Sequence, residues 1–454
     1  MTATRDGKDA VRWCDLIGWL TLKLDQYTQL KSLNVLLASF FAFATFQTAQ
    51  AQTVVRITGS TAYRAAVYQA ISDILQTGFV FGYTGTTASK ASQAIYTGTT
   101  KTSNISVIIK TSFSGSVGGI STLAANLTIG PGGSFTGGGG WLVDSTPQST
   151  AGTPNAPNDP SHLDAAITAD IAMADVFQAS APPVYQTPKL KDNFVGVVPF
   201  VWVATPGAPL SDPTNHPVTN VTTAQVKSLL LSNTLKLSSL TGDTGDTEAV
   251  LPVGRDEDSG TRIQALACAA IKVQTPLKQY QPLYNGATTP VVPPPAPGTQ
   301  ITGAGLWPAV TLNAINYPQG DSGYSSGGSL ASAVNVSHSG GMPTYANWFL
   351  TYFGINDAAS VTTGKQLEFN GVAYSVPNVE GPGAAGFVAQ YTYWGYEHLM
   401  YRTTFAAPGL TVATELASDL TTTSASVSGI LLSGMKVSRD KDGAAIEKGG
   451  KPGN

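Results

Sequence analysis

The feature that most constrains the fold is an almost wholly apolar run from Val195 to Val203. An uninterrupted run of this kind is typical of a strand that is buried on both faces of a mainly parallel sheet. A sheet buried in this way needs helices on both of its faces. The run therefore favours the α/β class.

Other apolar runs alternate with segments of helical spacing. The strand-like run Val54–Ile57 precedes apolar residues at helical spacing from Val67 to Leu75, and Val250–Val253 precedes a similar segment from Ile263 to Ile271. Alternating βα units predict a parallel sheet, and 454 residues are enough for more than one such sheet. We expect an α/β fold of two doubly wound lobes with a ligand cleft between them.

The chain order suggests how these lobes divide the sequence. We expect lobe 1 to combine residues 52–196 with 356–435, and lobe 2 to consist of residues 197–355. The Gly-, Pro- and Ser-rich stretch 130–162 is interpreted as a long surface loop. Residues 436–454 are charged and rich in glycine, so they are interpreted as a flexible tail.

The N-terminus has the features of an export signal. Lys31 precedes the apolar run Leu33–Ala44, which is too short to span a bilayer as an anchor. The small-x-small sequence Ala49-Gln50-Ala51 follows it, so we predict a signal peptide with an extended n-region in residues 1–51 and cleavage after Ala51. A buried helix is the alternative. Cleavage would place the protein in the periplasm or outside the cell.

Composition excludes several functions. The formal net charge is −3 and charged residues make up 12% of the chain, so there is no basic field to attract nucleic acid. The four histidines lack metal-ligand spacing, and neither a nucleophile elbow nor a phosphate loop with lysine is present. We therefore expect a monomer without a metal, a cofactor or a catalytic residue, and we do not expect an enzyme such as a phosphate-ester hydrolase.

Three turns between strands and helices combine glycine with hydroxyl residues. They are Gly59-Ser60-Thr61, Gly115-Ser116-Val117-Gly118-Gly119 and Ser259-Gly260-Thr261. A helix start has unpaired N–H groups and a partial positive charge, and it can bind an anion. Taken singly, each hydroxyl is more simply explained as a helix cap.

Two charged residues strengthen the case for an anion site. Arg255 lies four residues before Ser259, and a guanidinium can bind two oxygens of a tetrahedral anion. A salt bridge to Asp256, Glu257 or Asp258 is the alternative. Asp175 ends an apolar run and is either a helix cap or an acceptor for the proton of a protonated oxyanion. An obligatory acceptor would favour phosphate over sulfate.

In this order, the three turns, Asp170–Asp175 and Arg255-x-x-x-Ser259-Gly260-Thr261 resemble the periplasmic phosphate-binding component of bacterial phosphate ABC transporters. The resemblance covers about residues 54–402. It implies a fold like that of type II periplasmic binding proteins, with an inner-membrane ABC permease as partner. It also implies that the phosphate-binding residues are Ser60, Thr61, Ala62, Ser116, Asp175, Arg255, Ser259, Gly260 and Thr261.

The chain departs from that family in two respects. The loops at 130–162 and 280–345 are long, and Ala62 occupies the position after the threonine where the family commonly has an aromatic residue. Two other functions remain open. One is binding of another oxyanion such as sulfate or molybdate, and the other is a surface or structural role on the same scaffold without transport.

Overall fold

The computed structural model describes residues 52–137, 139–156, 162–205, 218–284, 301–335 and 347–449. The predicted signal peptide and most of the proline-rich stretch 288–303 lie outside these residues. The described residues belong to one compact unit.

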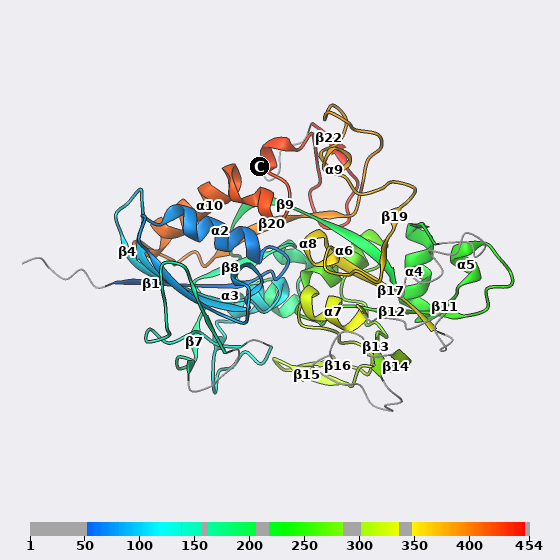
Figure 1. The fold of residues 1–454 in the computed structure, drawn as a ribbon, viewed down its shortest axis with the longest axis horizontal. Helices are drawn as coiled ribbons and strands as arrows, with labels where there is room; N and C mark the ends of the chain where they lie inside the picture. Colours follow the sequence, from blue (N-terminus) through cyan, green and yellow to red (C-terminus); the bar gives the residue numbers. More distant parts are fainter. Residues whose placement is uncertain are drawn as a thin grey trace, which may run out of the picture. The chain divides into compact units, whose positions relative to one another are not determined.

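A twelve-stranded sheet runs through this unit (Figure 1). Its strands follow the order β11-β12-β17-β9-β20-β8-β1-β4-β3-β2-β6, and β18 also pairs with β9. We call β20, β8, β1, β4, β3, β2 and β6 the first half of the sheet, and β11, β12 and β17 the second half. The strands are β1 (Thr53–Gly59), β2 (Val80–Thr84), β3 (Gln93–Thr99), β4 (Ser106–Ser112), β6 (Thr153–Asn155), β8 (Ile171–Ala174), β9 (Lys191–Thr205), β11 (Leu235–Lys236), β12 (Ala249–Val253), β17 (Asn347–Gly354), β18 (Lys365–Gln366) and β20 (Trp394–Tyr401).

The remaining described elements are short strand pairs and helices. The strands pair as β5 (Thr128–Ile129) with β7 (Ile167–Thr168), β10 (Asn220–Val221) with β19 (Glu368–Phe369), β13 (Tyr280–Tyr284) with β14 (Ile301–Leu306), β15 (Val310–Leu312) with β16 (Ile315–Tyr317), and β21 (Val437–Ser438) with β22 (Glu447–Lys448). The α-helices are α2 (Arg64–Ile74), α3 (Ser116–Ala124), α4 (Thr223–Ser232), α5 (Ser238–Thr241), α6 (Gly260–Cys268), α7 (Gly327–Val334), α8 (Ile355–Ala358), α9 (Val376–Glu380) and α10 (Gly409–Thr422). The 3₁₀ helices are η1 (Ala88–Lys90), η3 (Gln178–Ser180), η4 (Pro183–Tyr185), η6 (Ser424–Val427) and η7 (Leu432–Gly434).

The α/β class is confirmed, but the direction of the central strand differs from the prediction. Residues Val195–Val203 lie in β9 and are buried, as expected. However, β9 is antiparallel to β20, β17 and β18, so the sheet is mixed around it. Parallel pairing holds for β8-β1-β4 and for β12-β17. Burial on both faces produces an apolar run whatever the direction of the neighbouring strands, so the run could not reveal that direction.

The two halves also share one sheet, where the sequence predicted more than one. The first part of β9 pairs with β20, and its last residues, Phe200–Thr205, pair with β17. The 15-residue length of β9 makes this possible, because it reaches both halves. The lobe boundaries proposed from the sequence remain a proposal.

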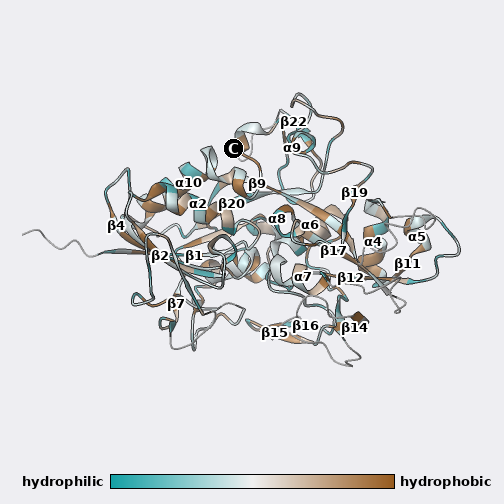
Figure 2. Cartoon of the chain, in the orientation of Figure 1, coloured by the Kyte–Doolittle hydropathy of each residue, from teal (hydrophilic) through white to brown (hydrophobic). Residues whose placement is uncertain are grey.

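Helices cover both faces of the first half of the sheet. Side chains of β8 alternate, so Ile171 and Met173 join the core beneath α2 and α10, while Ala172 and Ala174 join the core beneath α3. Figure 2 shows hydrophobic colour along the central strands. Because β1, β4 and β8 are parallel, their carboxyl ends lie at the same edge of the sheet, where helices begin.

Two stretches contain more buried structure than expected. The interpreted loop 130–162 contributes Trp141, which is fully buried and donates its indole N–H to the Ile167 carbonyl at 3.1 Å. The interpreted tail contributes β21 and the buried side chain of Arg439. The burial of these residues could not be predicted from the sequence, because a single apolar or charged side chain in a low-complexity stretch has no periodic pattern.

Candidate functional site

The turn after β1 presents two hydroxyls that do not cap the helix behind them. Tyr63 is the N-cap residue of α2 and makes no side-chain cap, and the Ala66 amide in the first turn donates instead to the Ser428 hydroxyl at 3.0 Å. The Ser60 amide donates to the Met173 carbonyl at 2.8 Å, which fixes the turn against β8. The Ser60 hydroxyl is buried without a hydrogen-bond partner among the described residues. The Thr61 hydroxyl accepts a hydrogen bond from Nη2 of Arg255 at 3.1 Å.

Ser116 and Asp175 form a direct pair. Ser116 is the first residue of α3, and Asp175 follows β8. The Ser116 hydroxyl donates to Oδ1 of Asp175 at 2.6 Å, and the Asp175 amide donates back to Oγ of Ser116 at 3.2 Å. Both residues are 1% exposed. The carboxylate is therefore held in one orientation, away from water.

Burial raises the pKa of Asp175 to about 6. The hydrogen bond from Ser116 and the charge of Arg255 oppose this rise, and the negative charge of Asp442 adds to it. Near neutral pH, the group is therefore mostly ionised, and a fall of about one pH unit is enough to protonate a large part of it. Such a group can accept a hydrogen bond from a protonated oxyanion.

Arg255 is held by main-chain carbonyls of a neighbouring loop. Its Nε donates to the Tyr324 carbonyl at 2.9 Å, and its Nη2 donates to the Ser325 carbonyl at 3.0 Å. Among the described residues, it makes no ion pair with Asp256, Glu257 or Asp258, so the salt-bridge alternative is not what the structure contains.

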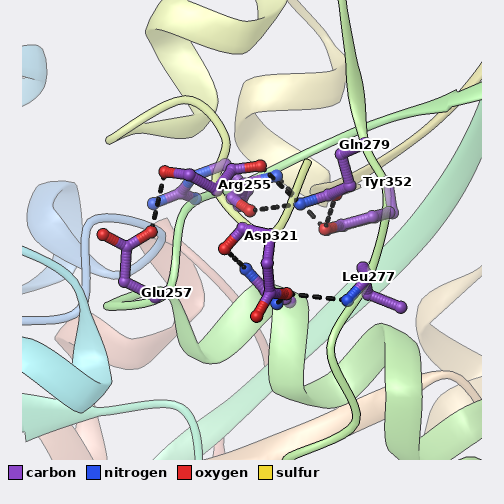
Figure 3. Close-up of polar contacts among 8 residues, drawn as sticks. Arg255, Glu257, Leu277, Gln279, Asp321 and Tyr352 are labelled. Carbon is purple, nitrogen blue, oxygen red and sulfur yellow. Dashed lines mark hydrogen bonds and ion pairs between the residues drawn. The ribbon is translucent and has the colours of Figure 1, made fainter. Parts of the chain in front are cut away.

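Buried polar contacts fix the backbone of the Arg255 loop (Figure 3). The Tyr352 hydroxyl accepts from the Arg255 amide at 3.1 Å and donates to Oε1 of Gln279 at 2.6 Å. The Gln279 amide group donates to the Arg255 carbonyl at 2.9 Å. In the same view, Asp321 accepts from the Leu277 amide at 2.7 Å. Asp321 also forms an ion pair with Arg262 of α6.

The start of α6, which follows β12 in the second half of the sheet, contributes the last three predicted residues, Ser259, Gly260 and Thr261. Ser259 is the N-cap residue of α6, and its hydroxyl accepts from the Arg262 amide at 3.3 Å. The hydroxyl therefore caps the helix, which is the simpler of the two explanations given above for such residues. Gly260 lies against Ser116 and Asp175, and a Cβ added at Gly260 would overlap the Asp175 carboxylate. Only glycine permits this close approach. Thr261 is buried beside it.

The nine predicted residues are all buried, and direct contacts join several of them across the two halves. Contacts join Asp175 to Ser116 and Gly260, and Arg255 to Thr61. Ala62, Ser259, Thr261 and the Ser60 hydroxyl take no part in these three contacts.

A main-chain carbonyl lies at the start of α3, which is a feature that the sequence did not indicate. The Asp258 carbonyl accepts from the amides of Val117 at 2.9 Å and Gly118 at 3.3 Å. Gly115 precedes the helix with φ of +100°, a conformation that favours glycine, and a Cβ there would overlap the same carbonyl. This carbonyl therefore occupies the position at which an anion would meet the helix start.

Several buried carboxyl groups lie near the site, and of these the sequence did not indicate Glu397. Burial, together with the charges of neighbouring acidic residues, raises the pKa of Asp258 well above its ordinary value and that of Asp256 to about 7. Glu397 of β20 is fully buried, and neither of its carboxyl oxygens has a hydrogen-bond partner among the described residues. Burial and the charge of Asp175 raise the pKa of Glu397 well above its ordinary value, and the nearby Ser60 hydroxyl partly offsets this rise. The sequence signal that could have indicated Glu397 is its position as an acidic residue within the aromatic strand β20.

A cavity of about 440 Å³ lies next to these elements. Serine hydroxyls and glycines form much of its lining, together with Gln93, Phe113 and Leu163. None of the nine predicted residues is part of the lining, although Ser114 and Ser325 connect it to the α3 start and to Arg255. The predicted residues therefore pack against one another beside this cavity.

Within the described ranges, no group of three or more histidine, cysteine or acidic side chains could hold a metal ion. The same residues contain no helix that is long and apolar enough to cross a membrane.

Comparison with protein-family models finds no matching family, and comparison with curated proteins finds no match. Solved structures do give matches. A putative phosphate ABC transporter substrate-binding protein with bound phosphate from Clostridium perfringens is 12% identical with a TM-score of 0.43, and the match covers 84% of this chain and 99% of that one. An ABC-type phosphate transport receptor from Vibrio cholerae is also 12% identical, with a TM-score of 0.42 over 83% of this chain and 99% of that one.

Both of these solved structures are phosphate-transport proteins of the ABC type. The same comparison also matches OxyR from Corynebacterium glutamicum, at 11% identity and a TM-score of 0.34 over 88% of this chain and 76% of that one. At these identities the similarity concerns the fold alone.

Proposed function

We propose that this chain is an exported solute-binding protein that captures inorganic phosphate between the two halves of its sheet and delivers it to an ABC permease. In this role no bond is made or broken. Export through cleavage after Ala51, a monomeric state and the division into lobes 52–196 with 356–435 and 197–355 are parts of the same proposal.

The observation that supports it best is the convergence of residues from four strand ends. Ser116 and Asp175 come from the first half, Gly260 follows β12 in the second half, and Arg255 reaches back to Thr61. Hydroxyl and guanidinium groups can donate to oxyanion oxygens, and Asp175 can accept the proton that phosphate carries and sulfate lacks at neutral pH.

The proposal requires a rearrangement of the site. Because Gly260 lies against the Asp175 carboxylate, the Ser259–Thr261 turn and Asp175 must separate to admit an anion. Anion oxygens would then take over the α3 amides that the Asp258 carbonyl now occupies.

Isothermal titration calorimetry with phosphate, and with sulfate as competitor, tests this function. We expect heat with phosphate and weak competition by sulfate. Asp175→Asn should lower phosphate affinity about tenfold, because a charged acceptor is lost, and should raise sulfate affinity, because the amide can donate. The exposed Asp440 gives a matched control, and Asp440→Asn should bind like the wild-type chain.

Three other outcomes have clear meanings. If Asp175→Asn keeps phosphate affinity and admits sulfate no better, Asp175 is not the proton acceptor. Tighter binding of sulfate or molybdate than of phosphate by the wild-type chain would favour the other-oxyanion function. No heat with any of these anions would favour a surface or structural role.

A further inference from the structure

The C-terminal segment, Val437–Gly443, packs against the candidate site where the sequence predicted a flexible tail. Val437 is 1% exposed. The Arg439 guanidinium lies 4.0 Å from the ring centre of Trp394, and its Nη2 donates to the Thr392 carbonyl at 2.8 Å. The segment is therefore anchored on β20 and on the residues that precede it.

Asp442 of this segment binds the loop that follows Asp175. One carboxylate oxygen, Oδ2, accepts from the Phe177 amide at 3.1 Å and from the Ser180 hydroxyl at 2.5 Å. These two donors lie within five residues of Asp175 along the chain. The carboxylate thus holds the Asp175 loop at two points.

The other carboxylate oxygen of Asp442 reaches the second half of the sheet. Oδ1 accepts from Nε2 of Gln264 in α6 at 2.7 Å, and the same Nε2 donates to the Asp175 carbonyl at 2.8 Å. Gly443, the next residue, lies against the Ala267 carbonyl of α6. One carboxylate therefore links the Asp175 loop to α6, which begins at Gly260.

We propose that the C-terminal segment is a latch across the candidate site, and that Asp442 is a positioning residue for Asp175. It acts through the Asp175 loop and through Gln264 and needs no contact with the ligand. The part that concerns phosphate rests on the proposed function, whereas the latch itself does not.

The Asp442→Asn variant tests the latch. An asparagine has one acceptor oxygen and one NH₂ group, so either Gln264 or the Phe177 amide must face a second donor. We expect faster hydrogen exchange over residues 175–180 and about tenfold weaker phosphate binding, which is within the usual range for coupled sites. The pH midpoint of phosphate binding should also fall. The charged groups that face Asp175 are Arg255, Glu397 and Asp442, and loss of one negative charge lowers the pKa of Asp175.

Asp440→Asn is the control, because it makes the same charge change two residues away on an exposed side chain. If Asp442→Asn and Asp440→Asn behave alike in exchange and in binding, the latch proposal is wrong. Faster exchange with unchanged affinity and an unchanged pH midpoint would make Asp442 structural only and would contradict its positioning role. If Asp442→Asn does not fold, Ser180→Ala removes one donor to the same carboxylate and should show faster exchange and weaker phosphate binding to a smaller extent, with no fall in the pH midpoint, because Asp442 keeps its charge.

The exchange measurement also separates the two proposals. If the wild-type chain binds no phosphate, the proposed function fails, but the latch still predicts faster exchange in Asp442→Asn than in Asp440→Asn. Equal exchange in the two variants would overturn the latch whatever the chain binds.

Discussion

Asp175 is a carboxylate that the fold keeps away from water, and its protonation is the residue property on which the proposed selectivity depends. Its pKa is raised from 3.8 to about 6, so between these pH values the folded chain holds a proton that the unfolded chain has lost. Stability from this group is present below pH 3.8 and is lost as pH rises to about 6. The loss is about 3 kcal/mol at 1.36 kcal/mol for each pKa unit.

Denaturant titrations at pH 4.5 and pH 7 check this sign. Other buried carboxyl groups, such as Asp256, titrate in the same direction, so the informative quantity is the difference between the wild-type chain and Asp175→Asn. We expect the free energy of unfolding to fall more steeply with rising pH in the wild-type chain. Equal pH dependence in the two proteins would show that Asp175 has an ordinary pKa.

At this scale, the sequence predicted the residues that follow strand ends but not the partners that come from far along the chain. Ser116 and Asp175 could be paired as neighbours in a site because both follow apolar strands. Gln264, Asp442 and Glu397 could not, because their proximity depends on how β20, α6 and the C-terminal segment pack.

At the scale of the elements, the start of α6 leaves no room for a side chain at Gly260, because this glycine lies against the Asp175 carboxylate. Gly260→Ala should improve the intrinsic helix propensity of α6 yet destabilise the protein by about 1–3 kcal/mol, because its methyl group overlaps the Asp175 carboxylate. The control is Gly328→Ala in the first turn of α7, where the nearest atoms lie 3.8 and 4.0 Å from an added Cβ. Thermal unfolding and phosphate titration of both variants check this. A Gly260→Ala protein as stable as Gly328→Ala would mean that the turn and Asp175 are not in contact in solution.

Helix starts were predictable as elements, because glycine and hydroxyl residues next to a helical apolar pattern have a direct physical meaning. The direction of β9 was not, since a strand buried on both faces shows the same apolar run in either direction. For the same reason, its role in joining the two halves became visible only from its pairing with β20 and β17.

At the scale of the whole molecule, the largest hydrophobic cluster spans both halves of the sheet. Val55 and Ile57 of β1 belong to the same cluster as Val253 of β12 and Phe349 of β17. We expect a single cooperative unfolding transition in scanning calorimetry, with equal calorimetric and van't Hoff enthalpies. Two resolved transitions would show that the halves unfold independently, and would favour the lobe boundaries predicted from the sequence as true domain boundaries.

Under the proposed function, the Asp258 carbonyl at the start of α3 competes with the anion for the amides of Val117 and Gly118. The two amides that it occupies are already satisfied, so an arriving anion gains from them only the difference between its own hydrogen bonds and those of the peptide oxygen. Charge favours the anion in that exchange, since a charged acceptor binds N–H groups more strongly than a neutral one. A neutral solute has no such advantage. If an anion binds there as proposed, the carbonyl therefore selects for a ligand that accepts hydrogen bonds more strongly than a peptide oxygen does.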